Sequence, residues 1–313
     1  MAGAAGDPNA GTRDFAFIQV MTPAKTMGLA EANTVLGEGT DAIGSNPAGL
    51  SRATSSRTLA GTLRFWTLGE SGGQIAYSFG DSLSRFALGA AYMNYGEIDM
   101  LDEEARPLGI AQPSSFSPSL TYARAFSERW RLGGTLKGYQ EYLGDFEGAQ
   151  SAIGIGVDVG LLYNPKVRNL GFGMALLNAG RKWTAHTYDG SDAGYTPAAI
   201  RAGLYYIPPA WAKLRLASEI QIDDGDNPIL SAAGEYGFSS FVQFRAGVRG
   251  NWREMKHLWT VVSEGNAGPF YGGEARRLGA GFTLNHGGLA LDYGLQWWTD
   301  LGIVHGLTLK RGW

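Results

Sequence analysis

The stretch Arg129–Gly144, RWRLGGTLKGYQEYLG, alternates between two kinds of residue in steps of two. One parity, from Trp130 to Tyr142, is mainly apolar or glycine, and the other carries Lys137 and Glu141. A period of two places successive side chains on opposite faces of a strand. The alternation lasts about 13 residues, longer than the five or six of a typical strand and long enough to cross a tilted bilayer. The stretch therefore predicts a membrane-spanning strand.

The same alternation recurs at 211–223, 241–252 and 289–298. Aromatic residues lie near the ends of several apolar faces, as in the two girdles of a transmembrane barrel, and bacterial barrels have an even number of strands. We therefore predict an all-β fold, an antiparallel transmembrane β-barrel of about fourteen strands. The predicted strands cover 57–68, 73–81, 84–96, 115–126, 129–143, 151–163, 168–179, 197–207, 211–222, 229–238, 241–252, 275–285, 288–299 and 303–313.

The predicted connections alternate between short and long. Outer-membrane barrels have short periplasmic turns and longer extracellular loops, so the alternation places both termini in the periplasm of a bacterial outer membrane. The long segments 97–114, 180–196 and 253–274 are the candidate partner-binding loops, because aromatic and apolar anchors dominate binding energy at interfaces. Their candidate anchors are Met100, Leu101, Trp183, Tyr188, Tyr195, Trp259, Phe270 and Tyr271.

Residues 1–56 precede the first predicted strand, and a barrel this wide needs something to fill its lumen. We predict that 1–56 form an N-terminal extension and plug, and that 57–313 form the barrel. A proline fixes its own φ and a glycine permits a tight turn, so the NPAGL element predicts a compact fold inside the barrel. Asp41 and Asn46 are expected to face arginines of the lumen. The predicted plug-motif residues are Asp41, Asn46, Pro47, Ala48, Gly49 and Leu50.

Charges of both signs fall on the inward parity of the predicted strands. Such groups form ion pairs that hold a plug, or line a permeation path. Gly154, Gly156 and Gly160 share an inward face and are expected to leave room for the plug. The predicted lumenal charge network consists of Lys137, Glu141, Arg215, Glu219, Glu235, Arg245, Arg249 and Asp292, with Lys310 beside it.

The N-terminal sequence is similar to that of a known family. Asn9-Ala10-Gly11-Thr12, Phe17-Ile18, Met27-Gly28 and the NPAGL element at 46–50 resemble the N-terminal region of the PorV/PorQ family of outer-membrane proteins. The same Asn-Pro-Ala-Gly element occurs in the related long-chain fatty-acid transporter (FadL) family, whose members are similar plugged barrels. Because the chain begins MAGAAGDPNAG without the apolar core of a secretory signal, we expect that a leader has been removed from this numbering.

Resemblance to PorV implies a non-enzymatic adaptor in type IX secretion. Its partners would be the secretion translocon or secreted cargo with C-terminal signal domains. The alternative, implied by the transporter family, is a FadL-like channel that carries hydrophobic small molecules across the outer membrane. The small and charged inward faces favour the adaptor, because a channel for apolar molecules needs an apolar track.

Other classes of function have weaker support. The segment GESGG at Gly69–Gly73 matches a nucleophile-elbow pattern around Ser71, but an amphipathic strand follows it instead of the required helix. The acidic run DDGDN at 223–227 lacks the continuation of a calcium loop and predicts a turn. There is no cysteine, the four histidines lack metal-binding spacing, and the net charge of −3 includes no basic block. We therefore predict no catalytic residue, no cofactor, no metal and no nucleic-acid partner.

Overall fold

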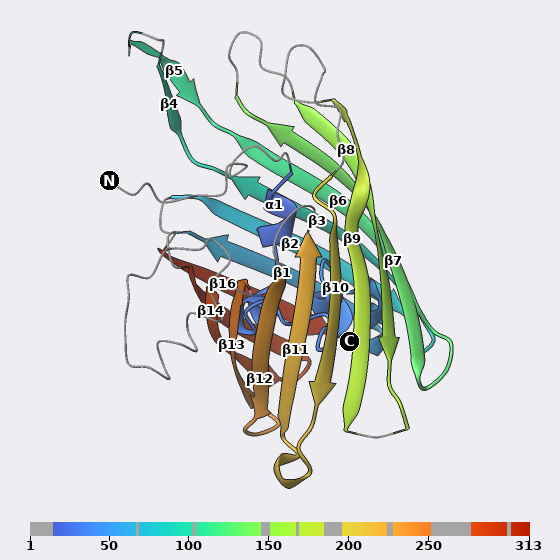
Figure 1. The fold of residues 1–313 in the computed structure, drawn as a ribbon. Coiled ribbons are helices and arrows are strands. Elements are labelled where there is room, and N and C mark those ends of the chain that lie inside the picture. Colours follow the sequence, from blue (N-terminus) through green and yellow to red (C-terminus); the bar gives the residue numbers. More distant parts are fainter. Residues whose placement is uncertain are drawn as a thin grey trace.

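The computed structural model describes residues 15–66, 69–101, 104, 106–144, 151–166, 169–184, 196–223, 228–251, 277–298 and 302–313. Within these ranges, fourteen antiparallel strands form a closed barrel in which β1 pairs with β16 (Figure 1). This confirms the predicted fold class. The barrel strands are β1 (Arg57–Phe65), β2 (Ser71–Gly80), β3 (Ser84–Asn94), β6 (Ser114–Ala125), β7 (Trp130–Tyr142), β8 (Ala152–Tyr163), β9 (Leu170–Thr184), β10 (Ala199–Tyr206), β11 (Leu214–Asp223), β12 (Ile229–Gly237), β13 (Val242–Asn251), β14 (Arg277–His286), β15 (Leu289–Trp298) and β16 (Gly302–Gly312).

The outer face of the barrel is apolar. On β7, Leu132 and Leu136 are 43% and 48% exposed, whereas Lys137 and Glu141 point inward and are 7% and 9% exposed. Exposed leucines on the outward parity suit a surface that contacts lipid. Near the short-turn end, a ladder of ring contacts joins neighbouring strands, as expected of an interfacial girdle. Its rings belong to Tyr77, Phe79, Phe86, Tyr122 and Trp313.

In the part of the chain that the structure describes, none of the helices has the length and apolar character needed to cross a membrane.

Two of the predicted long connections contain strand structure that the sequence did not predict. The segment predicted as a loop at 97–114 contains a separate hairpin, β4 (Ile98–Leu101) and β5 (Pro107–Ala111), which projects beyond the barrel wall (Figure 1). Strand β9 continues to Thr184 instead of ending at 179. Strands β4 and β5 are too short to show the apolar alternation that marks a membrane span. The added end of β9 contains Arg181 and Lys182, which interrupt that alternation.

Residues 15–53 lie inside the barrel, where most of them are buried, and this segment is referred to below as the plug. The plug contains the short helices α1 (Phe17–Val20) and α2 (Ala24–Gly28) and the 3-10 helices η1 (Gly39–Ala42) and η2 (Pro47–Arg52). Helix α2 packs against β14, β15 and β16, and η2 packs against β6, β7 and β8. The plug thus contacts opposite sides of the wall through different elements.

Inward glycines allow this close packing. A Cβ on Gly160 would collide with Asn46 and Pro47, and one on Gly154 would lie 3.1 Å from the Phe15 ring. Gly156 differs from expectation, because its inward side is occupied by the ring of Tyr139 from the neighbouring strand rather than by the plug.

Candidate functional site

A continuous network of charged side chains joins the plug to the wall formed by β11–β16. Register places Arg215 opposite Glu235, and Glu235 opposite Arg245, so that opposite charges meet across adjacent strands. Asp292 and Lys310 extend the network onto the next strands. The wall contributes Arg215 (β11), Glu235 (β12), Arg245 (β13), Asp292 (β15) and Lys310 (β16), and the plug contributes Lys25, Glu38 and Asp41.

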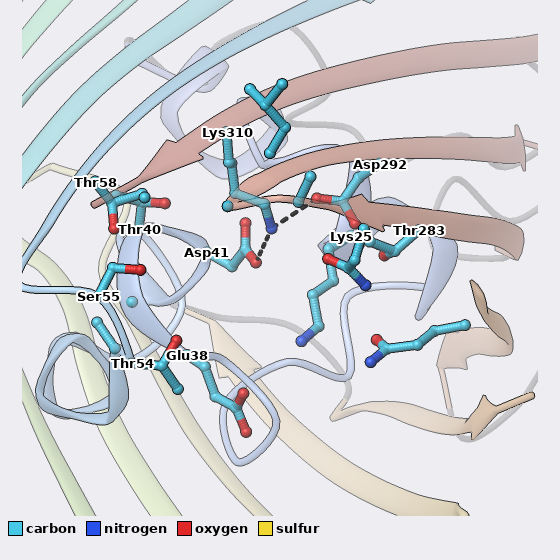
Figure 2. Close-up of a pocket in the computed structure, with 18 of the residues that line it drawn as sticks. Lys25, Glu38, Thr40, Asp41, Thr54, Ser55, Thr58, Thr283, Asp292 and Lys310 are labelled. Atoms are coloured by element: carbon cyan, nitrogen blue, oxygen red, sulfur yellow. Dashed lines mark hydrogen bonds and ion pairs between the residues drawn. The ribbon is translucent and has the colours of Figure 1, made fainter. Parts of the chain in front are cut away.

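Lys310 is the link between the plug and β15. Its Nζ lies 2.7 Å from Asp41 Oδ2 and 2.6 Å from Asp292 Oδ2 (Figure 2). Arg245 Nη1 donates to Asp292 Oδ1 at 3.2 Å, and Arg245 Nε lies 3.5 Å from Glu235 Oε2. Asp41 therefore meets a lysine, where the sequence predicted an arginine.

Glu235 is shared by three cations. Lys25 Nζ of the plug lies 3.6 Å from Glu235 Oε2, and Arg215 also pairs with Glu235. Arg215 Nη1 in turn donates to Glu38 Oε1 of the plug at 2.8 Å. Four cations and four carboxylates balance in this network, which allows the charges to be buried without an excess of either sign.

A cavity of about 490 Å³ lies beside the network (Figure 2). Its lining includes Lys25, Glu38 and Asp41 of the plug, together with the β14–β15 turn at 287–288. The cavity is therefore at the end of the barrel that carries the short turns. Because hydroxyl and charged groups dominate the labelled side chains around it, this cavity suits water and polar solutes, and an apolar ligand would leave those groups unpaired.

The attachment of Glu38 predicts a pH dependence of stability. Burial by itself raises the pKa of the Glu38 carboxyl, but Lys25 and Arg215 outweigh burial and hold the pKa below its ordinary value. When folding lowers the pKa of a carboxyl, its contribution to the stability of the folded state is complete above the unfolded-state pKa, which is about 4.3 for glutamate. That contribution is lost as the pH falls through the folded-state pKa. We expect the difference in Tm between wild type and Glu38→Gln to shrink in this acidic window. A difference that stays constant with pH would contradict the assignment.

A second, smaller pocket lies on the other side of the plug. It has a volume of about 60 Å³ and lies between Ile18, Met21 and Ile43 of the plug and the wall of β2, β3 and β6. The wall residues around it are mostly small, including Gly89, Ala91, Ser117 and Ser119, with Lys137 of β7 at one edge.

The remaining predicted lumenal charges lie in separate groups. Lys137 Nζ lies 2.6 Å from Asp158 Oδ2 and also donates to Asn178 Oδ1 at 2.8 Å, so it joins strands of the wall. Glu141 accepts a hydrogen bond of 2.8 Å from the backbone N–H of Phe15. Glu219 accepts one of 2.9 Å from the backbone N–H of Thr34. Two of these carboxylates therefore anchor the plug backbone.

Arg249 belongs to another group, in which its Nη2 donates to Gln221 Oε1 at 2.9 Å.

The plug motif folds tightly against β8. Asn46 Oδ1 accepts from the N–H of Ala48, which caps η2. Its Nδ2 donates to the carbonyls of Thr34 and Leu161 at 2.9 and 3.1 Å. Asn46 thus bonds to backbone carbonyls, not to the predicted arginine. Gly49 cannot carry a side chain, because a Cβ would collide with the carbonyl of Gly37.

The candidate loop anchors are only partly described. Met100 and Leu101 lie on β4 and Trp183 lies on β9, where its side chain is 63% exposed. Tyr188, Tyr195, Trp259, Phe270 and Tyr271 lie outside the described residues.

Ser71 opens strand β2, so its surroundings lack the strand-to-helix turn of a nucleophile elbow. Within the described ranges, no three His, Cys, Asp or Glu side chains gather into a group that could hold a metal ion.

Several buried charges lie outside the predicted lumenal network. Arg64, Asp158, Arg201 and Arg277 lie on inward parities, and the period of two could have identified them. The plug charges Lys25, Glu31 and Glu38 lie in short helices and turns, where no periodicity marks the buried face.

Comparison with known proteins establishes the fold. The sequence matches no protein-family model, and no curated protein is significantly similar to it. Among solved structures, it is similar to the monoaromatic hydrocarbon channel CymD, with a TM-score of 0.65, 12% identity and coverage of 94% of this chain and 98% of that chain. It is also similar to the toluene transporter TodX of Pseudomonas putida, with a TM-score of 0.64, 12% identity and coverage of 92% and 96%. The chain therefore shares its overall barrel fold with these two proteins, whereas the resemblance to PorV/PorQ stays a prediction.

Proposed function

We propose that this protein is a non-enzymatic channel for small hydrophobic molecules in the bacterial outer membrane, with both termini in the periplasm. The observation that carries the proposal is the pocket between the plug and the wall of β2, β3 and β6. The likeness in fold to CymD and TodX supports it. The adaptor role favoured by the sequence becomes the second candidate.

The two sides of the plug differ in chemistry. Charges fix the plug to β11–β16, as described above. On the other side, Ile43 packs beside the buried cluster of Leu50, Ala87 and Ala123, and Met21 belongs to a cluster of Phe, Met, Tyr and Ala side chains. An apolar molecule can follow this side of the plug without displacing ion pairs. These side chains supply part of the apolar track whose absence made a channel less favoured from the sequence, although Gln74, Ser117, Ser119 and Lys137 also line the pocket.

The wall beside the pocket contains a break in strand pairing. Phe116 pairs with Gln140 and Ser119 pairs with Lys137, but the two β6 residues between them have no register partner on β7. One of the two is Pro118, which has no N–H to donate to a ladder. We propose that the wall yields here during passage, because fewer backbone hydrogen bonds hold it closed.

On this proposal, the pocket must widen before a solute can pass. A volume of about 60 Å³ is well below the roughly 150 Å³ of an engineered apolar cavity that binds benzene. Ile18, Met21 or Ile43 must therefore move before an aromatic hydrocarbon can pass. Since these residues belong to the plug, passage requires a shift of the plug on its apolar side.

Blocking the pocket tests the proposal. Ser117 points into the pocket and is 6% exposed, so Ser117→Trp fills the route. We expect uptake of radiolabelled toluene by cells that carry the variant barrel to fall to the level of cells without the barrel, because the indole ring occupies the space that the solute needs. The matched control is Ala280→Trp on the exposed face of β14. Equal uptake by both variants would argue against this route.

A second candidate function has one specific observation in its favour. The β4–β5 hairpin projects from the end of the barrel with the long connections (Figure 1), and its Ile98, Leu108 and Ile110 are 50%, 64% and 58% exposed. Apolar side chains outside the lipid band mark a surface for a protein partner. If the PorV resemblance holds functionally, that partner is the secretion translocon or secreted cargo with a C-terminal signal domain.

Substitution on the hairpin separates the two functions. We expect the triple variant Ile98→Ser, Leu108→Ser, Ile110→Ser to lose most of any protein that co-purifies with wild type in a gentle detergent, because these side chains supply the apolar contacts. Asp99→Ser on the same hairpin is the control. Unchanged recovery of a protein partner from the triple variant would exclude the hairpin as its binding surface.

A further inference from the structure

Four arginines from four strands gather at the end of the lumen that carries the long connections. They are Arg64 near the end of β1, Arg201 near the start of β10, Arg249 near the end of β13 and Arg277 at the start of β14. Register places Arg249 directly opposite Arg277. Arg277 is also within electrostatic range of Arg64 and Arg201. Like charges directly opposite each other on a sheet are destabilising, so this arrangement needs a compensating partner.

The carboxylates around the cluster compensate its charge only in part. Glu31 Oε1 of the plug lies 3.9 Å from Arg277 Nη1, and Glu219 Oε1 lies 3.7 Å from Arg201 Nη1. Both distances exceed a hydrogen bond. Asp223, at the end of β11, is within electrostatic range of Arg249. These three carboxylates leave one positive charge in excess among the described residues.

Most of the guanidinium donors are unused. Arg64 is 0% exposed, and Arg201 and Arg249 are each 4% exposed. In the described part of the chain, no hydrogen-bond acceptor is present for Arg64 Nε and Nη2, Arg201 Nε and Nη1, Arg249 Nε and Nη1, or Arg277 Nε. Buried donors without partners are costly, and more so when charged. These atoms together define an unfilled set of donors.

The guanidinium groups are held in place by other contacts. Arg64 lies over the ring of Trp66 at 4.8 Å, and Arg277 lies over the ring of Trp298 at 3.6 Å. Arg64 Nη1 also donates to Thr22 Oγ1 at 3.2 Å. Such stacking fixes the planes of the guanidinium groups before any ligand arrives.

We propose that this arginine cluster is a binding site for an oxyanion, that is, a carboxylate, sulfate or phosphate group. Guanidinium forks match the paired oxygens of these groups, and charge-assisted hydrogen bonds to them are stronger than neutral ones. The oxyanion either is a free inorganic ion or belongs to a small organic acid. The site is separate from the apolar pocket beside β2, β3 and β6, so its existence does not rest on the proposed channel function.

Titration of the purified full chain in detergent tests the proposal. Sodium sulfate, sodium phosphate and sodium benzoate are compared with sodium chloride at equal ionic strength, with Tm and calorimetric heat as readouts. A ligand that binds only the folded state raises Tm in a saturable way. We expect saturation with at least one oxyanion and not with chloride. Saturation only with sulfate or phosphate assigns an inorganic ion, and saturation only with benzoate assigns an organic acid.

Substitution of single arginines tests whether oxyanion binding depends on the arginine cluster. Arg249→Gln is expected to weaken oxyanion binding by at least about tenfold, the effect of losing one charge-assisted hydrogen bond. It should also raise Tm in chloride alone, because it relieves repulsion with Arg277, an effect that loss of a merely structural arginine would not produce. If the Arg249→Gln barrel does not assemble, Arg277→Gln is the alternative variant for the same measurement. Arg311→Gln, an exposed arginine at the short-turn end, is the charge-matched control and should behave as wild type.

Absence of a saturable oxyanion effect, or an equal effect in wild type and cluster variants, would overturn the proposal. So would an experimental structure in sulfate in which a carboxylate of the chain itself occupies the donors.

Discussion

Gly294→Val is expected to unseat the plug and to open the lumen to ions. A Cβ at this inward position on β15 would collide with the carbonyl oxygen of Ala24 and lie 3.0 Å from Met27 Cβ. The nearest obstacle is helix backbone, which cannot rotate away as a side chain can. Overpacking of this kind costs about 1–3 kcal/mol or more, and α2 can relieve it only by leaving the wall. Single-channel conductance in a planar bilayer measures the result.

Gly61→Val is the matched control for this prediction. Gly61 lies on the outer face of β1, where a Cβ would meet nothing within 4 Å. We expect the control to conduct no more than wild type. A Gly294→Val barrel that stays equally closed would show that the plug does not seal the lumen through its contact with β15.

Glu235→Gln is expected to cause the largest loss of stability among the charge substitutions. The carboxylate is 2% exposed and is shared by Lys25, Arg215 and Arg245. Its removal leaves three cations with less compensation in a buried network. Breaking a buried ion pair in this way costs about 3–5 kcal/mol. The free energy of unfolding in denaturant, with the barrel in detergent, measures the change.

Glu104→Gln provides the comparison. Glu104 and Arg106 form an ion pair of 3.4 Å in which both side chains are more than 60% exposed. Exposed pairs are screened by water and contribute little, so we expect no measurable change. If both glutamates gave the same small loss, the network would not be what fixes the plug to the wall.

The barrel could be predicted from the sequence because contact with lipid on one face of each strand requires an alternation of apolar and polar residues. The predicted strand 129–143 and the observed β7, Trp130–Tyr142, differ by one residue at each end. The same period of two placed Arg215, Glu235 and Arg245 on the inward face, where the structure brings them together. Each wall charge could therefore be placed from its own strand, without knowledge of its partner.

The contacts that the plug makes with the wall could not be predicted in the same detail as the strands. Lys25 and Glu38 complete the network, yet they lie in a helix of five residues and in the turn before η1, where no regular alternation marks the side that faces a partner. Their partners are distant in sequence, as Lys310 is from Asp41. Such pairs depend on how the plug is rotated inside the barrel. The β4–β5 hairpin was missed for a related reason, because it lies beyond the membrane-spanning wall.

Uptake of toluene by cells with and without this barrel in their outer membrane tests the central claim most directly. The claim is that the apolar side of the plug, next to the break in pairing at Pro118, conducts small hydrophobic molecules. The account predicts faster uptake of radiolabelled toluene when wild-type barrel is present, and unchanged uptake of a sugar of similar size. Equal toluene uptake in both cell types, with the barrel correctly assembled, would contradict the channel and leave the binding of secreted proteins as the better account.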